Sequence, residues 1–247
     1  MGNSGKIPDE RKDLNQDAIF LHFRNQGIIF VFKINSVLDK ILDSVYNVHY
    51  MESYNLSLLT KRIYESKLSL VSSKTLKDIL EIQNKRSFFK IIQKFQKNGI
   101  IRKIERDKYQ ISNKNVSDFE MANFLYELSY ISLETALNYW GILSQFPFEI
   151  TSVTNKKSLI KRSDDKVFSY SHLSVNLFGM FVKKENFLIA TPEKALFDQL
   201  YLTTRGWKTA NLDEYDLERI EKKIFLDLCK RLKADKKIMK LVSDLKW

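Results

Sequence analysis

The spacing of apolar residues after position 70 predicts two helices in close succession. Thr75 can cap the first helix, in which Leu76, Ile79 and Leu80 recur at helical spacing. The second helix is predicted over residues 85–98, because apolar residues continue at the same spacing along its length. Only four residues, at positions 81–84, separate the two helices, so we expect a tight turn between them.

The second predicted helix is amphipathic in charge. Asn84 is a good N-cap for it, and Gly99 follows it as a C-terminal stop. Because a helix turns by about 100° per residue, three apolar side chains share one face: Phe88, Ile92 and Phe95. Four cations share the opposite face: Arg86, Lys90, Lys94 and Lys97. We therefore expect the apolar face to be core and the basic face to be exposed.

After Gly99 the pattern changes from helical to two short β segments. They are predicted at residues 100–104 and 109–111, joined by a polar turn. An earlier helix, over residues 56–70, would supply a third helix. Helices followed by a basic hairpin in this order are typical of a winged helix-turn-helix domain. We predict that domain over residues 53–115, with the second helix of the pair as its recognition helix.

The remaining pattern predicts a mixed α and β domain over residues 117–247. Thr191 and Pro192 supply the cap and the first-turn residue of a helix over residues 193–202. The other predicted helices cover residues 119–128, 132–139, 217–232 and 237–245, and the predicted strands cover residues 149–153, 167–173 and 187–190. The chain as a whole is therefore predicted to belong to the α+β class.

Residues 1–52 form an N-terminal extension in this prediction. Apolar residues at 27–34 predict a buried strand, and residues 37–46 predict a short amphipathic helix. An exposed strand of this composition would self-associate, so we expect it to be covered by the fold or by a partner subunit. The extension is thus a candidate for a homodimer contact.

Basic residues are concentrated in the predicted winged domain. Fifteen Lys and Arg against five Asp and Glu fall between Ser53 and Asn115, so this stretch carries +10 of the formal +11 of the chain. Each cation set against a phosphate releases condensed counterions, so a local excess favours a polyanionic partner. Lys-rich composition also arises from base-composition drift, and charge runs are usually solvated faces. The alignment of cations on one helix face favours nucleic acid over that alternative.

The polar residues of the helix and hairpin fall into three groups by position. Five lie near the N-terminus of the second helix or on its outward face and are expected to reach base edges: Lys85, Arg86, Ser87, Lys90 and Gln93. Two lie farther along and are expected to meet phosphates: Lys94 and Lys97. Four belong to the wing and are expected to straddle the backbone or enter the minor groove: Arg102, Lys103, Arg106 and Lys108. Winged helices also dock proteins and bind RNA, but the charge excess favours double-stranded DNA.

Composition disfavours several other classes of protein. Cys229 is the only cysteine, which excludes intrachain disulfides and thiolate-rich zinc sites, and its apolar surroundings predict a core position. His22, His49 and His172 lack metal-ligand spacing, and seven scattered glycines cannot form a phosphate loop, so no metal or cofactor is expected. Neither a membrane-spanning apolar run nor a signal-peptide core is present, so we expect a cytoplasmic protein.

Several segments in the second half of the chain carry a resemblance to a known family. They are residues 130–142 (YISLETALNYWGI), 149–154 (EITSVT), 168–172 (FSYSH), Phe178 with Gly179, and 189–202 (IATPEKALFDQLYL). In this order and spacing they resemble the C-terminal antitoxin domain of the AbiEi family. A winged helix precedes that domain in the family, as it is predicted to do here, so the resemblance covers residues 70–202.

The resemblance implies a bacterial type IV antitoxin that counteracts a nucleotidyltransferase-like toxin encoded beside it. It also implies repression of the antitoxin's own operon, through winged-helix binding to inverted repeats in the promoter. The C-terminal domain is implied to act in toxin neutralisation and in cooperative DNA binding, and the type IV scheme does not require a stable toxin complex. Residues 1–52 and a Lys-rich C-terminal tail depart from the family pattern, which leaves the dimerisation mode open.

Two other functions remain open from the sequence. One is a promoter-specific transcriptional regulator without a toxin partner, whose C-terminal domain senses a ligand or dimerises. The other is a DNA-processing enzyme, in which Glu193, Lys194 and Asp198 would be catalytic and Asp164 and Asp165 would bind a metal ion. A capped helix start explains the first three residues better, because Glu193 favours the positive end of the helix dipole. We therefore do not expect an enzyme.

Overall fold

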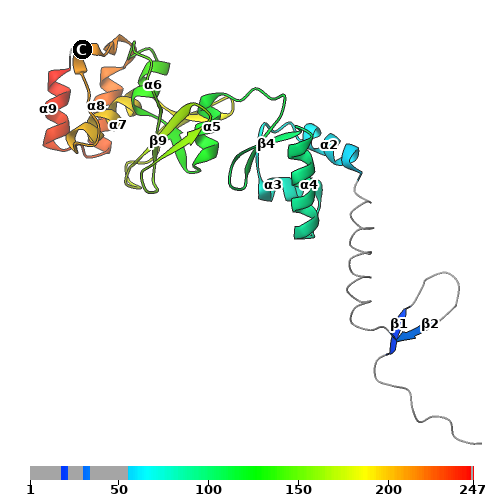
Figure 1. Cartoon of the computed structure of the whole chain (residues 1–247). Helices are drawn as coiled ribbons and strands as arrows, with labels where there is room; N and C mark the ends of the chain where they lie inside the picture. Colours follow the sequence, from blue (N-terminus) through cyan, green and yellow to red (C-terminus); the bar gives the residue numbers. More distant parts are fainter. Residues whose placement is uncertain (1–17, 22–29, 34–54, 246) are drawn as a thin grey trace, which may run out of the picture. The chain divides into compact units, whose positions relative to one another are not determined.

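The structure, a computed structural model of the α+β class, describes residues 18–21, 30–33, 55–245 and 247. The chain divides into two compact units, residues 1–59 and 60–247. In the first unit, β1 (Ala18–Leu21) pairs antiparallel with β2 (Phe30–Lys33), as Figure 1 shows. The strand predicted at residues 27–34 is therefore confirmed for β2. Its remaining residues and the helix predicted at 37–46 lie outside the described residues.

Residues 55–115, which we call the three-helix region, combine short helices with one small sheet. The helices are α2 (Leu56–Glu65), α3 (Ser73–Leu80) and α4 (Lys85–Lys97). The strands are β3 (Leu70–Ser72), β4 (Ile101–Glu105) and β5 (Lys108–Ile111), and they pair antiparallel in the order β3-β5-β4. The predicted hairpin is thus confirmed to within one residue at each strand end.

Helix α2 ends at Glu65, so the prediction that it continues to Leu70 is wrong. Lys67 has a φ of 56°, in the left-handed region that commonly ends a helix. Leu70 then begins β3, where it lies opposite Gln110. Apolar spacing alone could not separate the last helical turn from a short edge strand, because Ile63 and Leu70 also match the period of a helix.

Helix α3 begins earlier than predicted, because Ser72 and not Thr75 is its N-cap. The Ser72 hydroxyl accepts a hydrogen bond from the backbone N–H of Thr75 at 3.1 Å. Thr75 therefore lies inside the first turn, with its own hydroxyl 2.9 Å from that of Ser72. Serine and threonine are both favourable N-cap residues. Ser72 is the cap because it stands three residues before the backbone N–H that its hydroxyl accepts.

Residues 117–245, which we call the C-terminal region, are built on a six-stranded mixed sheet. Its order is β10-β11-β6-β7-β9-β8, with β11–β6 and β7–β9 parallel and the other neighbours antiparallel. The strands are β6 (Ser129–Ile131), β7 (Ile150–Thr154), β8 (Leu159–Ser163), β9 (Lys166–His172), β10 (Phe181–Lys184) and β11 (Phe187–Ala190). The three strands predicted here are confirmed as β7, β9 and β11, whereas β6, β8 and β10 were not predicted.

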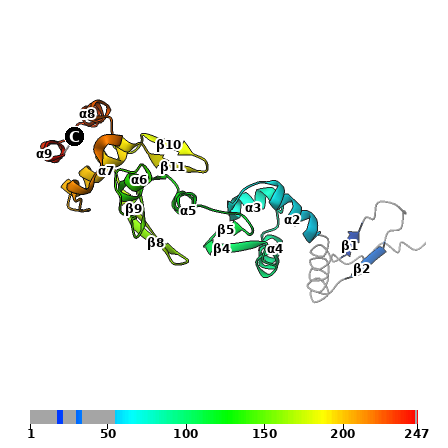
Figure 2. The same ribbon diagram turned by 90° about the horizontal axis from the view of Figure 1, so that it is seen from above.

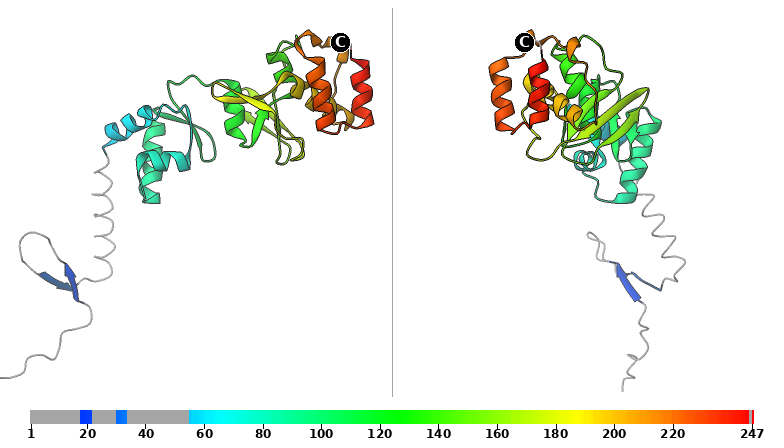
Figure 3. Two further views of the ribbon diagram at one scale, coloured as in Figure 1. Left: turned by 180° about the vertical axis from the view of Figure 1, so that it is seen from behind. Right: turned by 90° about the vertical axis from the view of Figure 1, so that its left-hand side faces the viewer.

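Helices cover this sheet and extend away from it. They are α5 (Asp118–Leu125), α6 (Leu133–Tyr139), α7 (Pro192–Thr204), α8 (Lys222–Arg231) and α9 (Lys236–Asp244). Figures 2 and 3 show α7 between the sheet and the pair formed by α8 and α9. This position explains why α7 has buried residues around its whole circumference rather than on one stripe.

The ends of two predicted helices are corrected by the structure. The helix predicted over residues 217–232 is a 3-10 turn, Leu217–Arg219, followed by α8. The helix predicted over residues 119–128 ends at Leu125, where the chain turns into β6. The predicted cap of α7 is confirmed, since the Thr191 hydroxyl accepts from the Lys194 N–H and Pro192 begins the helix. Cys229 is buried on α8, as predicted.

Within the part of the chain that the structure describes, no helix combines the length and apolar character needed to cross a bilayer.

Candidate nucleic-acid interface

Helix α4 begins at the predicted residue and ends at Lys97, one residue before the predicted end. The Asn84 side chain accepts hydrogen bonds from the backbone N–H groups of Arg86 and Ser87, at 2.9 and 3.1 Å. Gly99, with a φ of 66°, ends the chain's helical path in a conformation that costs glycine little. Two local features thus set the length of α4, and both can be read from the sequence.

The apolar face of α4 holds it against the rest of the three-helix region. Phe88, Ile92 and Phe95 are buried, as predicted, and Ile91 joins them. Ser87 is also buried, at 7% exposure, so the expectation that it lies among residues available to a base edge is wrong. Its position one turn before Ile91 places it on the inner face, because residues four apart share a face of a helix.

The outward face of α4 is mainly basic, although Phe89, Gln93 and Gln96 are also exposed on this helix. The exposed residues predicted to contact DNA are Lys85, Arg86, Lys90, Gln93, Lys94 and Lys97, and α4 contains no Asp or Glu. Among the described residues, Lys85, Arg86, Lys94 and Lys97 take part in no ion pair. Lys85 and Arg86 also stand in the first turn, where the helix dipole disfavours cations. An anion placed there would relieve the repulsion and accept their hydrogen bonds.

The hairpin of β4 and β5 supplies two further exposed cations. Lys103 is exposed, and the Arg106 side chain is 95% exposed at the tip, 3.6 Å from Asp107. The tip is tied to the start of α3, because the Ser73 hydroxyl donates to the Asp107 carboxylate at 2.9 Å. Lys74 follows Ser73 in the first turn of α3 and is exposed; the sequence prediction did not include it.

The other two hairpin cations are engaged within the chain. Lys108 is mostly buried, donates to the backbone carbonyl of Leu125 and pairs with Glu105 at 3.0 Å. Its predicted role as a DNA contact is therefore corrected, because its ammonium group is already surrounded by protein acceptors. Arg102 is half-exposed, and its guanidinium donates to Asp164 at 2.6 Å and to Gln110 at 2.7 Å. A phosphate would have to compete with Asp164 for it.

Glu105 is the centre of a cluster that joins the hairpin to the C-terminal region. Both of its carboxylate oxygens accept from the Lys161 ammonium group at 2.8 Å, and that group also donates to the Leu125 carbonyl. Burial acts to raise the pKa of Glu105, but the hydrogen bonds from Lys161 and Lys108 outweigh it and leave this pKa below its ordinary value. The carboxylate is thus held in its charged form.

Lys194 and Asp198, considered above for catalysis, lie inside the C-terminal region with no exposed surface. The ammonium group of Lys194 pairs with the Asp198 carboxylate and donates to the Tyr130 hydroxyl at 2.9 Å. Asp198 also accepts from the hydroxyls of Ser132 at 2.8 Å and Tyr130 at 3.2 Å. Burial raises the pKa of Asp198 and lowers that of Lys194, and their mutual attraction opposes both shifts.

The remaining titratable residues considered above do not gather into a metal site. Asp164 and Asp165 lie in the turn between β8 and β9, and His172 bonds through Nδ1 to the Lys156 carbonyl at 2.8 Å. His22 and His49 are outside the described residues. In the described ranges, no group of three or more His, Cys, Asp and Glu is arranged to hold a metal ion.

Comparison with protein-family models finds no match to this chain, and comparison with curated proteins finds none either.

Proposed function

We propose that the three-helix region is a winged helix-turn-helix domain that binds double-stranded DNA. The succession of α2, α3 and α4, followed by the hairpin of β4 and β5, supports this assignment. In it, α3 and α4 form the helix-turn-helix, α4 enters the major groove, and the hairpin is the wing.

The observation that carries the proposal is the charge of the outward face of α4. Five cations occupy a helix of 13 residues that has no carboxylate of its own, while the opposite face is core. Nothing in the folding of the domain requires so one-sided a distribution, because only the apolar face is needed to pack the helix. A duplex would receive base contacts from Lys85, Arg86, Lys90 and Gln93 and phosphate contacts from Lys94 and Lys97.

The biological role we infer is that of a cytoplasmic type IV antitoxin that represses its own operon. It rests on the resemblance of residues 70–202 to the AbiEi family, with a nucleotidyltransferase-like toxin as functional partner. Co-expression of the full chain with its neighbouring reading frame tests this role. Restored growth supports it. Unrelieved toxicity, or a neighbour unrelated to nucleotidyltransferases, would leave a DNA-binding regulator without a toxin partner.

DNA binding itself is tested by mobility shift with the promoter of the gene. The double variant Arg86→Ala, Lys90→Ala is expected to lose binding by at least about thirtyfold, since each base contact contributes about 1–3 kcal/mol. The control variant Lys236→Ala, Lys237→Ala removes two exposed cations from α9 and should bind within about threefold of wild type, because surface charges far from a contact are largely screened. Equal losses in both variants would show that α4 does not read the duplex.

The phosphate contacts are tested by the salt dependence of the same binding. Replacing Lys94 or Lys97 by Ala should weaken binding to all duplexes alike and lower the slope against salt concentration by about 0.9. A sequence-dependent loss with an unchanged slope would instead place these residues at base edges.

A further inference from the structure

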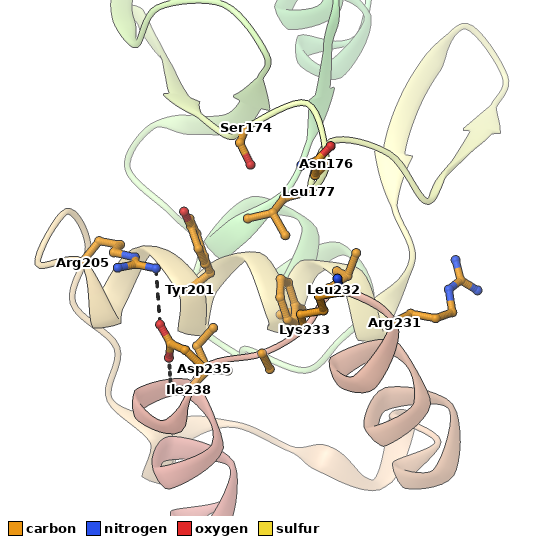
Figure 4. Close-up of a pocket in the computed structure, with 12 residues that line it drawn as sticks. Ser174, Asn176, Leu177, Tyr201, Arg205, Arg231, Leu232, Lys233, Asp235 and Ile238 are labelled. Carbon is orange, nitrogen blue, oxygen red and sulfur yellow. Dashed lines mark hydrogen bonds and ion pairs between the residues drawn. The ribbon is translucent and has the colours of Figure 1, made fainter.

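A cavity of about 410 Å³ lies in the C-terminal region, and none of its lining residues belongs to the three-helix region. Figure 4 shows its walls: helix α7 on one side, the turn from α8 to α9 on another, and the loop that follows β9 above. Its volume falls within the range of small-molecule sites in proteins. The cavity is separate from the proposed DNA-binding face.

The inner wall of the cavity is apolar and includes two aromatic rings. Phe197 and Ile238 are buried there, and Leu177 and Leu232 complete this wall. Tyr201 lies almost parallel to Phe197, with 14° between the rings and 6.4 Å between their centroids. This wall suits a flat or apolar part of a ligand.

The rim is cationic, with three basic residues from three different segments. Arg205 follows α7, Arg231 ends α8, and Lys233 lies in the turn between α8 and α9. Asp235 is the one carboxylate of the lining, and both of its oxygens have partners. One caps α9 by accepting a hydrogen bond from the Ile238 N–H at 3.0 Å, and the other pairs with Arg205 at 3.3 Å. The rim therefore keeps a net positive charge.

Two of these cations are available to a ligand. Lys233 is exposed and takes part in no ion pair among the residues that the structure describes. In the same residues, the hydrogen-bond partner of the Arg231 guanidinium is the sulfur of Met180, at 3.2 Å. A hydroxyl and an amide stand on the facing loop, at Ser174 and Asn176 (Figure 4). Neither side chain has a hydrogen-bond partner in the described part of the protein, so both can serve a ligand.

Helix dipoles explain part of this arrangement without a ligand. Cations are favoured at helix C-termini, which accounts for Arg205 and Arg231. The dipole does not account for the apolar wall between them or for the unpartnered polar groups of the facing loop. The dipole also does not explain why the residue at position 233 is a lysine. Its φ is 53°, and at such a position a helix-ending turn prefers glycine.

We propose that this cavity binds a small phosphorylated ligand with a flat ring, the chemistry of a mononucleotide. The phosphate lies against Arg231 and Lys233, since guanidinium and ammonium groups form their strongest hydrogen bonds with ionised acceptors. The ring lies on the wall formed by Leu177 and Tyr201. Binding here is independent of DNA binding by α4 and extends the role of the C-terminal region beyond the proposed function.

Calorimetric titration of the purified full-length chain with ATP, CTP, GTP and UTP tests the proposal. At least one should bind with Kd below about 1 mM, and the matching nucleoside should bind at least about tenfold more weakly because it lacks the phosphate. Tripolyphosphate carries the charge of the nucleotide without its ring, so its affinity measures the contribution of the cationic rim without that of the apolar wall. No binding of any nucleotide at millimolar concentration would overturn the proposal.

Three variants locate the bound nucleotide. Arg231→Ser with Lys233→Ser should weaken binding about tenfold or more, whereas Lys230→Ser with Lys236→Ser removes the same charge from nearby exposed positions outside the lining and should not. Equal losses in these two would reduce the effect to general electrostatics and overturn the site. Lys94→Ser with Lys97→Ser should also bind normally; a loss there would move the ligand to α4.

Lys233→Gly keeps the test clear of misfolding. Glycine adopts a positive φ without strain, so the thermal midpoint of this variant should equal or exceed that of wild type. Nucleotide affinity should nevertheless fall by several-fold, because the cation is gone. Unchanged affinity in this variant would remove Lys233 from the site.

Discussion

Single residues of helix α7 show how tertiary burial changes the meaning of a sequence pattern. Lys194 and Asp198 stand four residues apart, the spacing of an exposed ion pair on a helix surface, and yet neither is exposed at all. Their burial depends on the sheet on one side of α7 and on α8 and α9 on the other. The capped start of this helix could be predicted from Thr191 and Pro192, but its depth in the molecule could not.

Replacing Lys194 by Met should destabilise the protein by about 3–5 kcal/mol, because it leaves the Asp198 carboxylate buried without its countercharge. The double variant Lys194→Met, Asp198→Asn should recover most of this loss, since the amide still bonds Ser132 and Tyr130 without a charge. Urea unfolding of wild type and the two variants measures both values. A double variant no more stable than the single one would show that charge burial is not the cause.

At the level of elements, α4 was predictable because its ends are marked by local chemistry. A side-chain cap at Asn84 and a left-handed glycine at Gly99 act within a few residues of the helix, so the sequence contains them in full. Strands β6, β8 and β10 carry no comparable local feature. They are short. β6 pairs with strands distant in sequence, as Ser129 does opposite Thr154, and the hairpins of β8 with β9 and of β10 with β11 have no glycine to mark their turns.

The residues of the candidate interface divide in the same way, into those that a local pattern predicts and those that depend on a distant partner. The exposed cations of α4 were predicted from helical periodicity alone, because the apolar face determines which residues point outward. The burial of the Lys108 ammonium group was not predicted, since its carbonyl acceptor at Leu125 lies 17 residues away, beyond any local pattern. The faces of a helix, and its ends where a local cap marks them, can thus be predicted from sequence, whereas the partners of a long side chain cannot.

The attachment of the hairpin to the C-terminal region should depend on pH through Glu105. The pKa of its carboxyl group is lowered in the folded protein, so it contributes stability above its ordinary pKa of 4.5 and loses that contribution as the pH falls through the folded value. The free energy of unfolding should therefore differ most between wild type and Glu105→Gln at neutral pH. The difference should shrink below pH 4.5. A difference that is constant from pH 7 to about 3 would exclude this linkage.

At the scale of the whole molecule, the basic excess lies in one stretch of the chain while the C-terminal region is nearly balanced. An ion pair nevertheless links the two parts of the chain: Asp164, in the turn between β8 and β9, accepts a hydrogen bond from the guanidinium of Arg102 on β4. If the hairpin is the wing of the DNA-binding domain that we propose, this carboxylate occupies a group that would otherwise meet a DNA phosphate. The C-terminal region should therefore lower the DNA affinity of the hairpin by direct competition for one cation.

The variant Asp164→Asn tests this competition, with Asp165→Asn as its matched control. Both remove one negative charge from adjacent exposed positions, but only Asp164 contacts Arg102, and Asn accepts the φ of 52° found there. Asp164→Asn should bind duplex DNA several-fold more tightly, with a salt slope steeper by about 0.9, because Arg102 becomes free for one more phosphate. Asp165→Asn should raise affinity only slightly and leave the slope unchanged. If both variants behave alike, the effect is one of net charge, and Arg102 does not reach the backbone.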